Sequence, residues 1–188
     1  MLIDIKDLDE EKDLYKFKSH ADKCSRYVNE DVRLEIDTQM GKLAMGESIH
    51  FATTARWHLH DIIVWILSQT GTADLYFCTY AIKEFQARLI GNMQRDGLIK
   101  STTGLIDYRA NVHDANVIQL LEGFAEIGKM RTHAKLTIIR NEHWGVTITG
   151  SANLTQNTRA DVGVITCDLG VADYRINWIK QNIKDGTK

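Results

Sequence analysis

Two stretches decide the fold: His133-Ala134-Lys135-Leu136-Thr137-Ile138-Ile139 and Val146-Thr147-Ile148-Thr149-Gly150-Ser151-Ala152-Asn153. Apolar residues recur through both stretches with the period of a strand. The polar segment 140–143 between them is typical of a turn. If the two strands pair as a hairpin, the His-x-Lys start of the first lies beside the Gly-Ser-x-Asn end of the second.

Such a hairpin would gather groups that can grip a phosphate. His133 supplies an imidazole and Lys135 an ammonium. Ser151 and Asn153 offer donors to phosphate oxygens. Gly150 lets the backbone approach a ligand closely. These residue types at this spacing favour a site for phosphoryl chemistry.

At these residues the chain resembles the phospholipase D superfamily, whose signature is His-x-Lys, a later Asp, and Gly-Ser-x-Asn. The match is HAK at 133–135 and GSANLT at 150–155, and 157–162 looks like the family's Asn-x-x-x-acid element. There are two departures. The family Asp falls on Arg140, and the hairpin between the lysine and Gly-Ser-x-Asn is a few residues longer than usual.

The resemblance implies an α/β fold, a phospholipase D-like α/β/α sandwich with a mixed, largely parallel sheet. It also implies a reaction in which His133 attacks phosphorus and forms a phosphohistidine. Lys135 and Asn153 would hold the phosphate oxygens and balance the charge that grows on them. No metal and no other cofactor would be needed.

Three further residues complete the candidate site. Ser151 would donate to phosphate or to the histidine loop. Asp161 would hold the imidazole of His133 in the right tautomer. Arg159, in the loop before Asp161, can contact phosphate as a fork donor.

The implied chemistry needs two histidines, one to attack phosphorus and one to protonate the leaving oxygen. This chain carries one copy of the motif, so we expect a two-fold homodimer with a composite active site. Single-motif members resemble bacterial nucleases, which makes a metal-independent phosphodiesterase acting on DNA or RNA the leading hypothesis. The alternatives are a catalytically impaired nucleic-acid-binding or regulatory module, and a phospholipid hydrolase.

Composition sets looser bounds. The 188 residues carry a net charge of −2, so there is no global basic signal for nucleic acid, although acidic residues concentrate before residue 48 and the remainder is slightly basic. The three cysteines are far apart, which fits a reducing, cytoplasmic compartment. No apolar run is long enough to span a bilayer, so no membrane partner is expected.

The pattern along the chain predicts two regions, a charged segment over 1–46 that packs on the domain and a catalytic domain over 47–188. His58 and His60 are interpreted as surface or helix-start histidines, because residues two apart do not share a helix face. Periodicity predicts alternating elements: a partial helix in 8–30, strands at 32–37, 48–53, 74–82, 98–108 and 162–167, and helices at 56–69, 83–95, 117–127 and 171–184.

Overall fold

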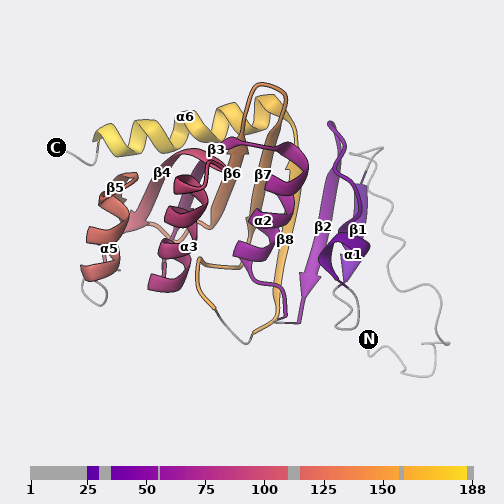
Figure 1. Cartoon of the computed structure of the whole chain (residues 1–188), viewed down its shortest axis with the longest axis horizontal. Coiled ribbons are helices and arrows are strands. Elements are labelled where there is room, and N and C mark those ends of the chain that lie inside the picture. The colour runs from indigo at the N-terminus through magenta and orange to yellow at the C-terminus, as the bar shows by residue number, and fades with distance from the viewer. Residues whose placement is uncertain (1–24, 30–34, 55, 110–114, 157–158, 186–188) are drawn as a thin grey trace, which may run out of the picture.

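The computed structural model describes residues 25–29, 35–54, 56–109, 115–156 and 159–185. These residues form one 8-stranded sheet flanked by helices (Figure 1). The strands are β1 (Ser25–Asn29), β2 (Ser48–Thr53), β3 (Ala73–Thr79), β4 (Ile99–Asp107), β5 (Glu126–Met130), β6 (Leu136–Arg140), β7 (Gly145–Gly150) and β8 (Asp161–Cys167). The helices are α1 (Ile36–Met40), α2 (Leu59–Thr70), α3 (Glu84–Arg95), α5 (Ala115–Glu122) and α6 (Leu169–Asp185).

The strand order is β1-β2-β8-β7-β6-β3-β4-β5. β6 and β8 run antiparallel to their neighbours on both sides, and the pairs β1–β2, β3–β4 and β4–β5 are parallel. All the described strands other than β6 and β8 therefore point the same way. The sheet is mixed, as expected, and most of its strands share one direction.

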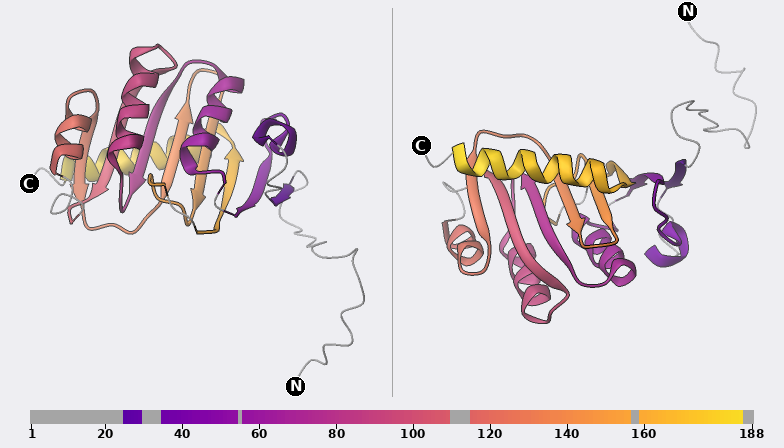
Figure 2. Two further views of the ribbon diagram at one scale, coloured as in Figure 1. Left: turned by 60° about the horizontal axis from the view of Figure 1, so that its bottom comes forward. Right: turned by 90° about the horizontal axis from the view of Figure 1, so that it is seen from above.

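Helices cover both faces of the sheet, which gives the expected α/β/α sandwich. α2, α3 and α5 lie on one face, and α6 crosses the other (Figure 2). Successive side chains of a strand point to opposite faces of the sheet. Leu75 and Phe77 of β3 belong to the apolar cluster under α2 and α3. Tyr76 and Cys78 belong to the cluster under α6. Burial on both faces explains why β3 is apolar at nearly every position.

Most elements lie where the periodicity predicts them, and their limits have local causes. Gly71 and Gly97 follow α2 and α3 with φ of 74° and 78°, a conformation that favours glycine. α2 begins after His58, whose backbone N–H donates to the Asp61 carboxylate at 2.8 Å. That bond satisfies an otherwise unpaired group at the helix start.

Two predictions of local structure are wrong. The helix expected over 117–127 ends at Glu122, and residues 126–130 form β5 at the edge of the sheet instead. The strand expected over 32–37 is replaced at its end by α1, in which Ile36 and Met40 are one turn apart and Met40 is fully buried. In both cases long-range packing overrides a weak local pattern.

The N-terminal prediction is tested only in part. Residues 1–24 lie outside the described part of the chain, as do 30–34. Residues 25–29 form a strand that pairs in parallel with β2, so they belong to the same sheet as the rest of the domain. No helix within the described ranges is long and apolar enough to cross a membrane.

Candidate active site

The hairpin expected from the sequence is present and places the motif. β6 and β7 are antiparallel, with Leu136 opposite Thr149. Lys135, which precedes β6, therefore lies beside Gly150 at the end of β7. β8 begins at the same edge of the sheet, because Gly163 pairs with Gly150. β3 also ends there, because it runs antiparallel to β6. β4 ends beside β3, because these two strands are parallel. One end of the sheet thus collects all parts of the motif.

His133 and Lys135 are close enough to act on one ligand. The Lys135 Nζ donates to the His133 carbonyl at 3.1 Å and lies 3.5 Å from the His133 Nδ1. His133 is exposed and Lys135 half-buried. Burial lowers the pKa of Lys135, and the charge of Asp161 partly offsets that effect. The ammonium is therefore held near the imidazole with part of its hydration removed, which strengthens its attraction for an anion.

Ser151 and Asp161 are joined directly. The Ser151 hydroxyl donates to the Asp161 Oδ1 at 2.6 Å and accepts the Val162 N–H at 3.1 Å. The single hydroxyl proton is therefore engaged by the carboxylate, which also acts electrostatically on Lys135. The role expected for Asp161, orienting the imidazole of His133, stays a prediction.

Asn153 is fixed by a second contact between distant segments. Its Oδ1 lies 3.4 Å from the Thr79 hydroxyl, which donates its proton to the Ala81 carbonyl at 2.9 Å. The next residue, Leu154, forms a parallel bridge with Ile82, and both are buried. The end of β3 therefore positions Asn153 at the same edge as Lys135.

A buried carboxylate below the motif was not expected from the sequence. Asp107, the last residue of β4, is fully buried and accepts the Thr132 N–H at 2.9 Å. It also accepts from the Arg109 Nε at 2.8 Å and Nη2 at 3.0 Å. The Thr132 hydroxyl in turn accepts the Ala134 N–H at 3.1 Å. Asp107 thus anchors the backbone on both sides of His133.

The electrostatics of Asp107 follow from these bonds. The hydrogen bond from Arg109 is the largest cause of a pKa well below the usual range of a carboxyl, and the backbone donors add to it. Burial acts in the opposite direction and is outweighed. Asp107 is therefore an anion at neutral pH. A signal existed in the sequence, an acidic residue at the end of the apolar run Leu105-Ile106, but only the fold brings it beneath His133.

Gly150 has a structural reason to be a glycine. A Cβ at this position would meet the Val162 carbonyl and the Gly163 Cα of the neighbouring strand. The glycine therefore allows the close approach of β7 and β8, and its expected role in the approach of a ligand stays a prediction.

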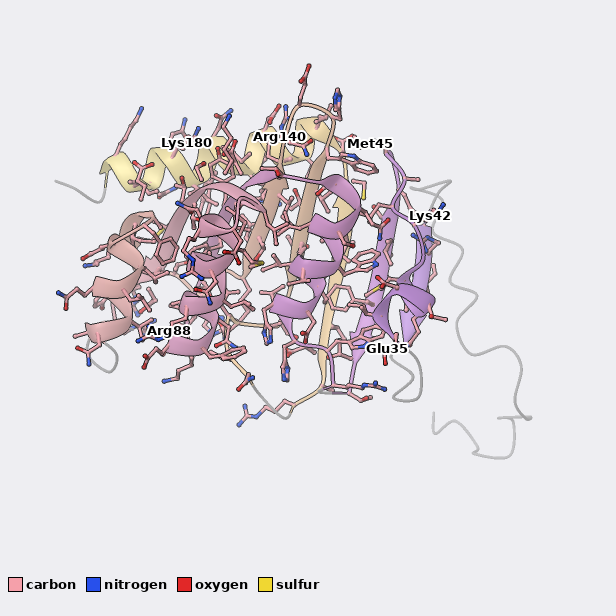
Figure 3. The ribbon with its side chains drawn as sticks, viewed as in Figure 1. Glu35, Lys42, Met45, Arg88, Arg140 and Lys180 are labelled. Carbon is pink, nitrogen blue, oxygen red and sulfur yellow. The ribbon has the colours of Figure 1, made fainter. Side chains whose placement is uncertain are left out.

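The departure at Arg140 lies away from the site. Arg140 ends β6, five residues beyond Lys135, which is about 17 Å along a strand. Figure 3 shows it beside α6. Its Nε donates to the Asp173 carboxylate at 2.8 Å and its Nη1 donates to the Asn141 carbonyl. The replacement of the family Asp therefore changes the far end of the strand and not the candidate catalytic groups.

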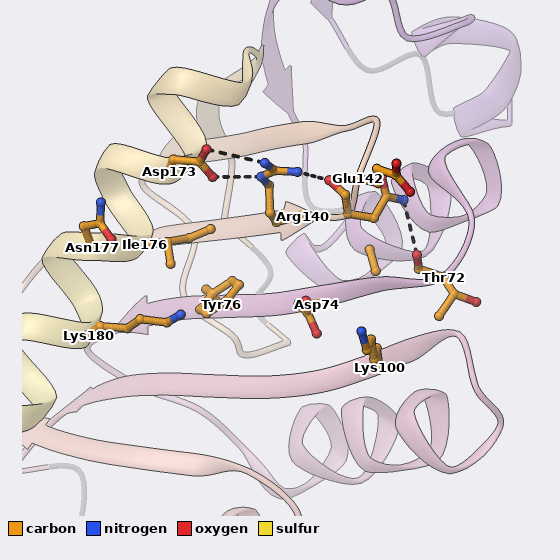
Figure 4. Close-up of a pocket in the computed structure, with 12 residues that line it drawn as sticks. Thr72, Asp74, Tyr76, Lys100, Arg140, Glu142, Asp173, Ile176, Asn177 and Lys180 are labelled. Atoms are coloured by element: carbon orange, nitrogen blue, oxygen red, sulfur yellow. Dashed lines mark hydrogen bonds and ion pairs between the residues drawn. The ribbon is translucent and has the colours of Figure 1, made fainter.

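A cavity of about 630 Å³ opens at that far end, between the sheet and α6 (Figure 4). Its charged lining is balanced, with three acids, Asp74, Glu142 and Asp173, and three bases, Lys100, Arg140 and Lys180. A balanced lining gives no net attraction for a polyanion. The cavity therefore lies away from the candidate site, and its lining does not favour a polyanion.

The remaining candidates are placed as follows. Arg159 is exposed in the segment before β8. His58 caps α2, but His60 is buried against Phe85, and burial lowers its pKa. His60 is therefore a helix-start histidine, one of the two interpretations made from the sequence, and it does not lie at the surface. Across the described residues no three His, Cys, Asp or Glu side chains converge in a way that could hold a metal ion.

Comparisons with known proteins bear on the fold. No family model and no curated protein matches the chain. Among solved structures, the crystal structure of polyphosphate kinase from Porphyromonas gingivalis is similar, with a TM-score of 0.50 and 16% sequence identity over 71% of this chain. The match spans only 26% of the kinase chain. The fold class expected from the sequence, an α/β/α sandwich with a mixed sheet, is confirmed, and the kinase structure shares this fold.

Proposed function

We propose that this chain is a metal-independent phosphodiesterase, a nuclease that cleaves DNA or RNA through a phosphohistidine. One observation carries the proposal. The His-x-Lys and Gly-Ser-x-Asn segments, separate in sequence, converge at one edge of the sheet, with Lys135 beside Gly150. The proximity of side chains that resemble the phospholipase D signature supports the proposal.

In the first step of this mechanism the His133 Nε2 attacks phosphorus. A nitrogen–phosphorus bond forms and the bond to the leaving oxygen breaks, while a second, protonated His133 gives its proton to that oxygen. In the second step the second His133, which is now neutral, takes a proton from water. The water oxygen bonds to phosphorus and releases the first His133.

Lys135 and Asn153 stabilise the negative charge that develops on phosphorus oxygens in both steps. Their geometry supports this role, because the ammonium of Lys135 is near the imidazole and Asn153 is positioned at the same end of the sheet by its contact with Thr79. Asp161 accepts a hydrogen bond from Ser151 and acts electrostatically on Lys135, which orders the site and balances part of its positive charge.

A homodimer supplies the second histidine. Exposure supports this part of the proposal: His133 and Ser151 are both exposed, and Val162, next to Asp161, keeps 60% of its surface accessible. An apolar side chain at the rim of the site offers a surface that a second chain can cover. A two-fold axis through this edge would bring both His133 side chains to one phosphate.

The position of Arg140 favours an enzyme over an impaired binding module. The main argument for lost turnover is the replaced family Asp, and that residue lies at the opposite end of β6. A change there leaves His133, Lys135 and Asn153 in place.

The test of turnover is a panel of phosphodiesters assayed with saturating EDTA. We expect a generic aryl phosphodiester and single-stranded DNA or RNA to be cleaved, because His133 supplies the nucleophile. Polyphosphate and phospholipid vesicles complete the panel. Loss of activity in chelator with recovery in magnesium or zinc would refute the mechanism, and cleavage of vesicles alone would favour a lipid hydrolase.

The test of the composite site is subunit mixing. Excess His133→Ala chain should inhibit wild-type chain by forming hybrids with a single histidine. The matched control is His143→Ala, an exposed histidine at the hairpin turn on the other end of the strands. A fully active monomer in sedimentation, or hybrids with half the wild-type rate, would contradict a shared site.

A further inference from the structure

A row of aromatic and cationic side chains runs outward from His133. The ring of Tyr80 lies 5.4 Å from the ring of His133, between centroids. The Arg109 Cζ lies 5.3 Å from the centre of the Tyr80 ring and 5.9 Å from the centre of the Tyr108 ring. Each side chain therefore contacts the next, and we call Tyr80, Arg109 and Tyr108 the tyrosine–arginine row.

The row is rigid at its centre and open at its outer end. Asp107, fully buried, holds the guanidinium of Arg109 through Nε and Nη2 and also accepts its backbone N–H at 2.9 Å. Tyr108 keeps 49% of its surface exposed, and the Arg109 side chain 44%. An aromatic ring ordered by a fixed cation and left open to water is a surface on which another planar group can stack.

The chemistry of the row matches a nucleobase with its phosphate. A base presents a flat π-face to Tyr108 whatever its identity, and Arg109 can attract the neighbouring phosphate. A polyphosphate or a lipid headgroup has no aromatic face to offer. Because Tyr80 contacts His133, the base that stacks belongs to a nucleotide close to the phosphate under attack.

Charge makes stacking more important here. The chain has a net charge of −2, so neutralisation of many phosphates, which drives binding to duplex DNA, is weak. Bases in a duplex are already stacked and paired, whereas bases in a single strand are free to stack on protein rings.

We propose that the tyrosine–arginine row is a base-stacking subsite that selects single-stranded nucleic acid. The inference rests on the proposed phosphodiesterase function and specifies its substrate. Tyr108 and Tyr80 bind the base, Arg109 holds the adjacent phosphate, and Asp107 is a positioning residue that fixes Arg109.

The test compares two labelled ligands with the same number of phosphates, an oligothymidylate and an abasic oligomer. Binding is measured by fluorescence anisotropy in the His133→Ala chain, so that neither ligand is cleaved. We expect the oligothymidylate to bind more tightly than the abasic oligomer. Tyr108→Ala should weaken binding of the oligothymidylate by about 5- to 150-fold and bring it to the level of the abasic oligomer. Tyr108→Phe should keep the preference.

The matched control is Tyr174→Ala on α6. Tyr174 is also exposed beside an arginine, with the Arg175 Cζ 5.5 Å from its ring centre. It follows Asp173, which pairs with Arg140 at the opposite end of β6 from His133. This variant should bind like its parent. Equal binding of the two ligands by the parent, equal weakening of both by Tyr108→Ala, or no binding of either would overturn the subsite.

These outcomes are distinct from failure of the proposed function. Binding of the oligothymidylate through Tyr108 without cleavage of any phosphodiester would support the subsite and contradict the proposed phosphodiesterase. Cleavage of small diesters with a preference for duplex over single-stranded DNA would support the phosphodiesterase and contradict the subsite.

Discussion

Replacement of Asp107 by Asn should destabilise the fold and slow turnover together. The carboxylate accepts the Thr132 N–H on one oxygen and Arg109 donors on both. An Asn side chain keeps one acceptor oxygen and turns a donor toward the remaining N–H groups. Because Thr132 is buried, its N–H loses its partner without gaining water.

The magnitude follows from these contacts. An unpaired buried N–H costs about 1–3 kcal/mol. The exposed guanidinium of Arg109 can be rehydrated, so the loss of its pairing adds little. A loss of about 1–3 kcal/mol corresponds to a fall in Tm of roughly 2–12 °C for a domain of this size. Turnover should fall as well, since Thr132 precedes His133.

The assay is thermal unfolding at several pH values. The folded-state pKa of Asp107 lies below the unfolded value of about 4, so its stabilisation is present above that pH and is lost as the pH falls toward the folded pKa. The difference in Tm between wild type and Asp107→Asn should therefore be largest near neutral pH and shrink below about pH 5.

Asp173→Asn is the control. Asp173 pairs with Arg140 at 2.8 Å, but it is 51% exposed and far from His133. Loss of that surface pair should cost at most about 1 kcal/mol and leave turnover unchanged. Similar Tm losses in the two variants, or a difference that does not change with pH, would refute the anchoring role of Asp107.

Three further predictions concern the candidate site, Arg140 and the binding of nucleic acid. His133→Ala should abolish turnover with an unchanged Tm, and Lys135→Ala and Asn153→Ala should each lose about 3–4 kcal/mol of transition-state stabilisation in kcat/KM, by analogy with an oxyanion donor. Asp161→Asn should lose less turnover than His133→Ala. A rate near wild type in His133→Ala would contradict the assignment of His133 as the nucleophile. Arg140→Asp, which restores the family residue, should not raise turnover and should lower Tm because it faces Asp173; a gain in rate would show that the far end of β6 affects catalysis. Nucleic-acid binding should weaken with salt through counterion release, whatever the base sequence, as a titration at rising salt would show; salt-independent binding would exclude phosphate contacts.

The sequence by itself determined the class of fold and the central hairpin. Apolar periodicity is a local property that survives without knowledge of partners, so β6, β7, α2 and α3 lie close to their predicted ranges. The spacing of His-x-Lys and Gly-Ser-x-Asn placed Lys135 beside Gly150 for the same reason, since an antiparallel hairpin fixes its own register.

Only the tertiary structure decided which distant residues serve that hairpin. Asp107 and Tyr80 lie more than twenty residues before His133 and reach it because β3 and β4 end at the edge where β6 begins. The sheet order β7-β6-β3-β4 comes from long-range packing that no local pattern encodes. Gly150 is a second residue whose structural role the sequence alone does not reveal. Its need for a glycine arises from the Val162 carbonyl of a neighbouring strand, a contact that exists only after the sheet has assembled.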